Sequence, residues 1–166
     1  MARRGAMWPT WLSFDAEYEK LGHGSQGLFQ FLWMHPDLNS GGYITLAPRA
    51  WSRRASDLTI EMTQGQLDEL LATNWVAMDD DTAELLVRPF IRLDSCQKPH
   101  IYVNAMRAVQ TCRSPLLRVT GWEEIQAVLT IDEYRARANR MAGGLAGQVV
   151  PRHPGARCGP AAEVGR

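Results

Sequence analysis

The chain has 166 residues, enough for one main domain with an extension or tail and for a core that needs no disulfide bonds. Hydrophobic residues make up 45% of it and charged residues 22%, which is typical of a soluble globular protein. No apolar run approaches the roughly 18 residues of a membrane span, and the start MARRGAMWPTWLSF lacks the apolar stretch of a secretory signal. We therefore expect a cytoplasmic protein with no membrane partner.

Charge is balanced over the whole chain, with 18 basic and 18 acidic residues, but it is unevenly distributed. Residues 1–98 hold 9 basic and 13 acidic residues, a net charge of −4, whereas residues 99–166 hold 9 and 5, a net charge of +4. A nucleic-acid site must therefore be a local basic patch or lie toward the C-terminal end. The three cysteines are an odd number without a CxxC pair, which favours a reducing compartment over a disulfide framework.

The first predicted element is a core helix in the stretch SQGLFQFLWMHPD, where apolar residues recur at helical spacing from Leu28 and Pro36 ends the helix. After the turn Asn-Ser-Gly-Gly, the segment YITL at residues 43–46 predicts one short strand. A second helix, short and basic, opens at Ala47 with Pro48 in its first turn.

A third helix is predicted over residues 63–74. Thr63 and Gln66 have the spacing of a capping box, three leucines form an apolar stripe, and Asn74 is expected to end the helix in the left-handed conformation. Two β-prone runs, residues 75–78 and 85–88, then flank the polar turn Asp-Asp-Asp-Thr and predict a hairpin.

The order helix, strand, helix, helix, hairpin predicts an α+β, mainly helical fold of the winged helix-turn-helix kind. In this interpretation residues 63–74 are the recognition helix and residues 75–91 the wing.

The C-terminal third predicts a helical extension followed by a flexible tail. Residues 99–113 repeat apolar positions at helical spacing, Ser114-Pro115 starts a further helix, and Thr120 with Glu123 and Thr130 with Glu133 have capping-box spacing. From Gly143 the chain is rich in Gly, Pro and Ala. The expected parts are an N-terminal arm (1–24), a winged-helix domain (25–98), a helical extension (99–142) and a flexible tail (143–166).

Residues 8 to about 118 resemble a known family in three stretches: WLSFDAEYEKLGHGSQGLFQFLWMHPDLNSGGYITL, MTQGQLDELLATNWVAMDDDTAELLVRPFIRLD and KPHIYVNAMRAVQTCRSPLLRV. They are similar to the N-terminal domain of phage and prophage replication-initiation, or replisome-organiser, proteins, a winged-helix group related to the DnaD-like primosomal proteins. The resemblance implies DNA binding or primosome assembly at a replication origin, with helicase-loading partners. The chain departs from two-domain members because no sizeable second domain follows residue 142, which puts helicase contact in doubt.

The predicted DNA-binding residues form two groups. Arginines in and just after the second helix are placed to hold phosphates, and polar residues at the expected exposed start of the third helix can reach bases, since glutamine can pair bidentately with adenine. The arginines are Arg49, Arg53 and Arg54, and the polar residues are Thr63, Gln64 and Gln66. The wing is not expected to insert into DNA, because its tip, Asp79–Asp81, is acidic.

Arg88 and Arg92 alternate along the last strand and its continuation and are included among the candidate DNA contacts. With Lys98 and the later arginines Arg107, Arg113 and Arg118 they can form a second basic surface. The alternative is that these arginines are solvated or paired with the wing aspartates.

Catalytic and metal chemistry find little support. The GxGxxG letters at residues 22–27 lack a preceding strand, so they predict a turn with Ser25 as a helix cap. Cys96, His100 and Cys112 lack a fourth ligand and finger spacing, so we expect no metal and no cofactor. Asp79–Asp81 and Glu123–Glu124 are interpreted as exposed charge runs, and no catalytic triad stands out, so an enzyme is not expected. Aromatic residues are assigned to the core: Trp8, Trp11, Phe14, Phe29, Phe31, Trp33, Trp51 and Trp75.

Two alternatives to a replication protein remain open at this point. A winged-helix transcriptional regulator would have the same fold and bind a promoter. A protein-interaction module would instead use the acidic wing and third helix to dock on a basic or DNA-bound partner. The helices of residues 99–142 can also pair two copies of the chain into a homodimer.

Overall fold

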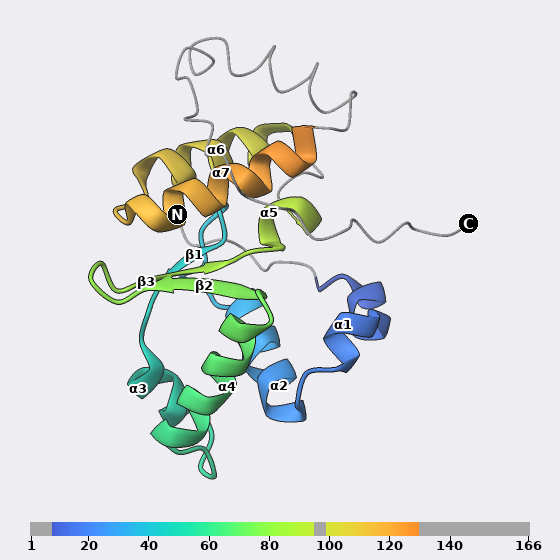
Figure 1. Cartoon of the computed structure of the whole chain (residues 1–166), viewed down its shortest axis with the longest axis vertical. Coiled ribbons are helices and arrows are strands. Elements are labelled where there is room, and N and C mark those ends of the chain that lie inside the picture. The colour runs from blue at the N-terminus through green and yellow to red at the C-terminus, as the bar shows by residue number, and fades with distance from the viewer. Residues whose placement is uncertain (1–7, 95–98, 130–166) are drawn as a thin grey trace.

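The computed structural model of the chain describes residues 8–94 and 99–129, and these form an α+β, mainly helical fold (Figure 1). In chain order the elements are η1 (Thr10–Phe14), α1 (Ala16–Glu19), α2 (His23–Trp33), β1 (Tyr43–Thr45), α3 (Pro48–Trp51), η2 (Ser52–Arg54), α4 (Ile60–Ala72), β2 (Val76–Asp79), β3 (Glu84–Val87), α5 (Phe90–Leu93), α6 (Pro99–Thr111) and α7 (Pro115–Leu129). The predicted tail and the predicted capping box at Thr130 lie outside the described residues.

The strands form a small antiparallel sheet in the order β1-β3-β2, with Tyr43 opposite Leu86 and Val76 opposite Val87. The predicted strand and hairpin are thereby confirmed. The helix before the hairpin ends as predicted, because Asn74 adopts φ +60°, a conformation that asparagine tolerates better than most residues. Ala83, the last residue before β3, also has positive φ, at +51°.

Helices cover both faces of the sheet (Figure 1). Below it in this view lie α2 and α4, and above it lie α6 and α7. Side chains on β3 alternate between the two layers: Leu85 and Val87 join the core with α2 and α4, whereas Leu86 joins the core with α6 and α7. This explains why β3 is apolar at three successive positions, since a strand buried on both faces has no solvent side for polar residues.

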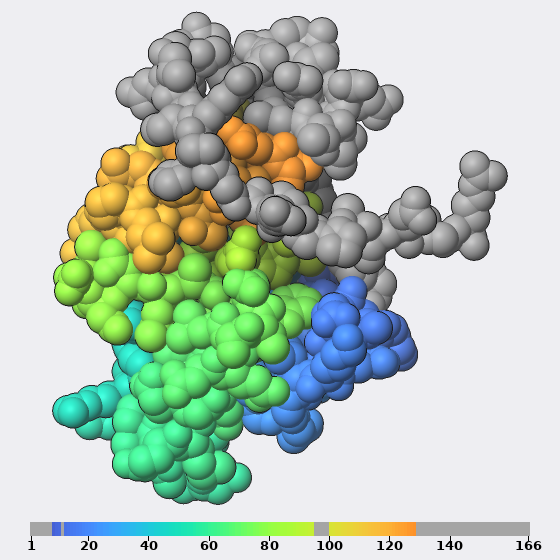
Figure 2. Space-filling view, in the orientation of Figure 1, coloured from blue at the N-terminus to red at the C-terminus, as the bar shows by residue number. Residues whose placement is uncertain are grey.

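The helical extension is thus part of the folded body. Tyr43 is buried between the layers, and its hydroxyl donates a hydrogen bond to the Leu117 carbonyl of α7 at 3.0 Å. Gly121 lies against the same hydroxyl, where a side chain would not fit: a Cβ atom at Gly121 would be 2.0 Å from it. Figure 2 shows the yellow-to-orange helices lying directly on the green hairpin segment.

Three expected helix starts are wrong. Ser25 and Thr120 lie inside α2 and α7, and Thr63 lies inside α4. In each case the true helix begins earlier, at His23, Pro115 and Ile60 respectively. Hydroxyl residues inside helices can bond to a backbone carbonyl of the preceding turn, as Thr63 and Thr120 do, so their presence alone does not mark an N-terminus.

Most of the aromatic residues assigned to the core are confirmed there. Phe29, Trp33 and Trp51 are buried, while Trp8 and Trp75 pack partly buried against them. Edge-to-face contacts connect these rings, for example Phe29 and Trp75 with centroids 5.1 Å apart. The assignment of Phe14 is wrong, because its side chain is 80% exposed at the end of the short η1 helix.

Candidate nucleic-acid interface

The basic segment of residues 48–54 forms α3 and the following η2 turn. Pro48 starts the helix, where its missing N–H costs nothing, and Trp51 anchors the segment in the core at 4% exposed. With Trp51 pointing inward, Arg49 and Arg53 are exposed. Among the described residues neither forms an ion pair, so both guanidinium groups are available to a ligand.

An open hollow of about 650 Å³ lies between this segment and the start of α4. We call it the α3–α4 hollow. Its lining consists of two guanidinium groups, one amide and five apolar residues: Leu46, Ala47, Pro48, Arg49, Ala50, Arg53, Ile60 and Gln64. Three of the residues predicted to bind DNA, Arg49, Arg53 and Gln64, therefore meet at one place. In Figure 2 the teal segment that carries α3 projects from the lower left of the molecule.

Arg54 is also exposed but points toward α2. Its guanidinium carbon lies 5.9 Å from the centre of the Phe31 ring, a cation–π distance, and the Phe31 ring contacts His35 edge-on at 5.1 Å. Burial lowers the pKa of His35 below its ordinary value; Asp37 opposes this effect and the Arg54 charge adds to it. His35 is therefore neutral near pH 7, and the only charge in this small stack is that of Arg54.

The start of α4 differs from the prediction, and this changes which residues face outward. Thr59 is the N-cap, and its Oγ1 accepts a hydrogen bond from the Met62 N–H at 3.2 Å. Thr63 is therefore in the helix interior, fully buried, with its hydroxyl donating to the Thr59 carbonyl at 2.9 Å. The prediction that Thr63 contacts DNA from an exposed helix start is wrong because its side chain faces the core.

The two glutamine side chains of α4 have different surroundings. Gln66 lies against Gly24 of α2, so closely that a Cβ atom at Gly24 would be 2.6 Å from the Gln66 Nε2. Its amide therefore packs on a neighbouring helix. Gln64 is exposed beside the hollow and donates from Nε2 to Asp68 Oδ1 at 3.2 Å. Of the three predicted base-reading residues, only Gln64 has a free path to a ligand.

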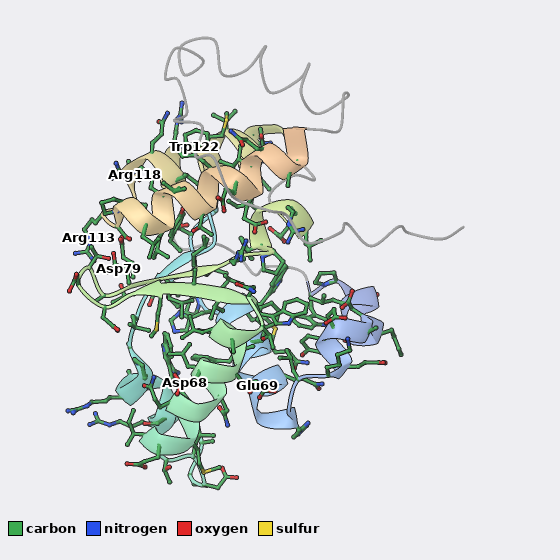
Figure 3. All side chains as sticks on the ribbon, viewed as in Figure 1. Asp68, Glu69, Asp79, Arg113, Arg118 and Trp122 are labelled. Atoms are coloured by element: carbon green, nitrogen blue, oxygen red, sulfur yellow. The ribbon has the colours of Figure 1, made fainter. Side chains whose placement is uncertain are left out.

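Glu69 has a structural role that the sequence did not suggest. Its Oε1 accepts from the Gly22 N–H at 2.8 Å, and its Oε2 accepts from the Ser25 hydroxyl, so it caps the start of α2. These hydrogen bonds, the one from Ser25 above all, lower the pKa of Glu69. Figure 3 shows Glu69 on the side of α4 that faces α2 and Asp68 on the opposite side.

The outward face of α4 consequently carries little that favours DNA. Glu61 and Asp68 are exposed on it, and no lysine or arginine occurs anywhere in α4. Gly65 lies between these two acids, and a Cβ atom there would meet nothing within 4 Å. The positive charge of this region comes entirely from the arginines of α3 and η2.

Arg88 and Arg92 are placed away from that region, in an ion-pair cluster under α7. The carboxylate of Glu124 accepts from Arg88 Nε at 3.2 Å and from Arg92 Nε at 2.6 Å. Arg88 Nη1 also donates to Asn74 Oδ1 at 3.3 Å, which links the cluster to the end of α4. The alternative of ion pairing holds for these two arginines, but their acid is Glu124 and not a wing aspartate.

The interpretation of Glu124 as part of an exposed charge run is wrong, because it is 4% exposed. It shares the inward face of α7 with Leu117 and Gly121, at helical spacing. Burial raises the pKa of Glu124 above its ordinary value, against the opposing charges of Arg92 and Arg88. The predicted helix start at Ser114-Pro115 is confirmed, and helical periodicity counted from it places Glu124 on the same face as Leu117 and Gly121.

The tip of the hairpin is fastened to the α6–α7 turn (Figure 3). Arg113 Nη2 donates to the Thr82 carbonyl at 2.7 Å, and the Ser114 N–H donates to Glu84 Oε2 at 2.8 Å. Partial burial raises the pKa of Glu84, but the N–H groups of Ser114 and Arg113 outweigh this and bring it below its ordinary 4.5. A hairpin tip held in this way has little freedom to move relative to α6 and α7.

The other residues considered for metal or cofactor chemistry are placed as follows in the described part of the chain. Among residues 8–94 and 99–129 no group of three His, Cys, Asp or Glu side chains is placed to hold a metal ion. Cys112 is buried and burial raises its pKa to about 11, while Cys96 lies outside the described residues. Residues 22–27 form the cap and first turns of α2. No helix in the described part of the chain is long and apolar enough to cross a membrane.

Comparison with known proteins adds no further assignment. No known protein family, no curated protein and no solved structure matches the chain.

Proposed function

We propose that this chain is a winged helix-turn-helix protein that binds duplex DNA. The observation that carries the proposal is the order α2, β1, α3, α4, β2, β3 together with the strand order β1-β3-β2. In a winged helix the two helices after the first strand are the helix-turn-helix pair, and the following hairpin is the wing. Here α3 and α4 take the first role, and β2 and β3 take the second.

The proposed DNA contact is made mainly to phosphates, through Arg49, Arg53 and Arg54. Arg49 and Arg53 are exposed at the α3–α4 hollow, and Arg54 is exposed over the Phe31 ring of α2. None of the three is neutralised by an ion pair within the described residues. The outward carboxylates Glu61 and Asp68 disfavour close contact between the middle of α4 and a groove. Binding of this kind is salt-sensitive and only weakly dependent on sequence.

The biological setting we propose is the initiation of phage or prophage DNA replication, or primosome assembly. It rests on the resemblance of residues 8 to about 118 to the replication-initiation family. A transcriptional regulator with the same fold is distinguished by its target: a footprint at a promoter, with none at an origin, would favour it.

The proposed DNA contact is tested by titrating labelled duplex DNA with the full chain at several salt concentrations, with fluorescence anisotropy as the readout. Each lost phosphate contact reduces the slope of log K against log salt by about 0.9, so the triple variant Arg49→Ala, Arg53→Ala, Arg54→Ala is expected to lose about 3 from it. The matched single control compares Arg53→Ala with Arg107→Ala, which changes an exposed arginine of α6 in the opposite layer. Unchanged binding by the triple variant refutes the site.

A second candidate function is docking on a basic protein partner. The observation that favours it is the acidic outward face of α4, with Glu61 and Asp68, and the acidic tip of the hairpin, with the exposed Asp80 and Asp81. This function predicts no retardation of duplex DNA even at low salt. It also predicts that the double variant Glu61→Lys, Asp68→Lys no longer binds the basic partner. If DNA is the ligand instead, the same double variant is expected to bind it more tightly.

Pairing of two copies through the C-terminal helices has one supporting feature. Leu116 and Val119, one turn apart on α7, are 62% and 40% exposed. Sedimentation of the full chain and of a Leu116→Glu variant is the corresponding measurement, with dimer expected for the first and monomer for the second.

A further inference from the structure

The aromatic groups at the end of α2 form a small cluster that includes one arginine of the proposed DNA contact. Two neighbours share the Phe31 ring: the His35 imidazole meets it edge-on with centroids 5.1 Å apart, and the Arg54 guanidinium carbon lies 5.9 Å from its centre. Arg54 belongs to η2 and is exposed. A cation–π contact at an exposed site is weak, so a phosphate can draw this guanidinium away from the ring.

The structure defines which atom of His35 takes up a proton. Nδ1 accepts a hydrogen bond from the Asp37 N–H at 3.2 Å, so the neutral ring carries its proton on Nε2. A second proton therefore binds at Nδ1, where it removes this hydrogen bond and directs an N–H toward the Asp37 carboxylate, whose Oδ2 lies 3.8 Å away. Because the His35 side chain is only 9% exposed, solvent screens the new charge weakly.

Two charged groups from different elements act on this ring. Burial is the main cause that lowers the pKa of His35; Asp37, in the turn after α2, opposes the effect, and Arg54, in η2, adds to it. The other ring packed on Phe31 is that of Trp51, which is uncharged. The positive charges of His35 and Arg54 thus disfavour each other. This coupling is reciprocal: moving the guanidinium away favours protonation of the imidazole, and protonation of the imidazole favours moving the guanidinium away.

We propose that His35 regulates the DNA contact through Arg54: a proton taken up by His35 drives the Arg54 guanidinium from the Phe31 ring to a phosphate, and the chain binds DNA more tightly as the pH falls. A bound phosphate neutralises Arg54, so the charged imidazole is less disfavoured in the complex than in the free chain. Arg49 and Arg53 add affinity without this coupling, since the arginine charge that acts on His35 is that of Arg54.

The inference rests on the proposed DNA binding, and the experiment distinguishes the two. The full chain is titrated with labelled duplex DNA at about pH 7.5 and about pH 5.5, at equal salt, with fluorescence anisotropy as the readout. The wild-type chain is expected to bind about fivefold more tightly at the lower pH. His35→Asn keeps a hydrogen-bond acceptor near the position of Nδ1 but stays uncharged, and it is expected to reduce this ratio to about twofold or less. The matched control is His100→Gln, which removes an exposed histidine of α6 in the opposite layer and is expected to keep the wild-type ratio.

A second measurement tests the coupling directly. The His35 imidazole is titrated by NMR in the wild-type chain and in Arg54→Ala, each with and without DNA. In the free chain, Arg54→Ala is expected to raise the pKa of His35, because a positive charge that opposes protonation is removed. DNA is expected to raise the same pKa in the wild type and to change it little in Arg54→Ala.

The possible results separate the regulation from the binding. If His35→Asn keeps the wild-type ratio, or if Arg54→Ala leaves the pKa of His35 unchanged in the free chain, the inference is overturned while DNA binding stands. A ratio lost equally in His100→Gln overturns it as well, because the pH dependence then follows the total charge of the chain. Absence of binding by the wild-type chain at both pH values refutes the proposed function itself, and the inference with it.

Discussion

The contact between α7 and the sheet can be tested with one methyl group. A Cβ atom at Gly121 would lie 2.0 Å from the Tyr43 hydroxyl and 3.1 Å from Val109 Cγ2. Tyr43 is 5% exposed, and its hydroxyl donates to the Leu117 carbonyl at 3.0 Å. The ring therefore cannot retreat from an alanine at position 121 without losing this hydrogen bond or displacing α7.

The change in unfolding free energy expected for Gly121→Ala follows from three effects. Losing a buried hydrogen bond costs about 1–3 kcal/mol. Forcing an extra methyl group into a packed core costs about 1–3 kcal/mol. The better helix propensity of alanine offsets about 1 kcal/mol of this. We therefore expect Gly121→Ala to lower the free energy of unfolding by about 3 kcal/mol.

The assay is urea unfolding followed by tryptophan fluorescence, with the midpoints compared at a common slope. The matched control is Gly65→Ala, also in a helix interior, where a Cβ atom meets nothing within 4 Å. This control is expected to raise the free energy of unfolding by about 1 kcal/mol. In a Tyr43→Phe background, which removes the obstructing hydroxyl, the cost of Gly121→Ala should fall to about 1 kcal/mol. If Gly121→Ala is as stable as Gly65→Ala, the packing of α7 on Tyr43 is refuted.

Three further predictions concern ion pairs and helix ends. Arg88→Met is expected to lower the free energy of unfolding by about 3 kcal/mol, because the buried Glu124 carboxylate then keeps only one arginine partner. Glu124→Gln is expected to lower it by about 1 kcal/mol, because the two arginines left without a partner are partly exposed. Urea unfolding measures both values, and a larger loss for Glu124→Gln than for Arg88→Met contradicts the assignment. Because the pKa of Glu84 is lowered, its ionised form stabilises the fold above pH 4.5, and this contribution is lost as the pH falls. The difference in unfolding free energy between wild type and Glu84→Gln should therefore shrink from about pH 6 to about pH 3. A difference that stays constant over this range argues against the contribution. Thr59→Ala is expected to lower the free energy of unfolding by about 1 kcal/mol, because α4 loses its N-cap hydrogen bond. Thermal unfolding measures this, and the control Ser56→Ala, at an exposed serine before the helix, is expected to show no measurable change.

The sequence predicts the sheet well because its signals are local. Two β-prone runs around an acidic turn define the hairpin, and Asn74 marks the end of the preceding helix whatever the rest of the chain does. The start of that helix is harder to predict, because Thr59 and Thr63 both match a cap and only the packing of Thr63 in the core decides between them.

The candidate site could be predicted only in part for a related reason. Arg49 and Arg53 lie beside a core tryptophan in sequence, which is enough to expose them. The roles of Glu69 and Glu124 depend on α2 and on the hairpin, each of which is more than 30 residues away along the chain. Nothing in the local pattern of an acidic residue indicates that a distant helix N-terminus or a distant arginine will cover it.

The burial of β3 on both faces has a consequence for how the chain acquires its structure during synthesis. Leu85 and Val87 can be covered by α2 and α4 as soon as the hairpin leaves the ribosome, but Leu86 and its neighbour Tyr43 wait for α6 and α7. Until about residue 129 has emerged, the nascent chain presents one apolar side of its sheet to the cellular environment. A nascent chain stopped after the hairpin thus leaves this side of the sheet uncovered, and the native packing is reached only when α7 closes over Tyr43.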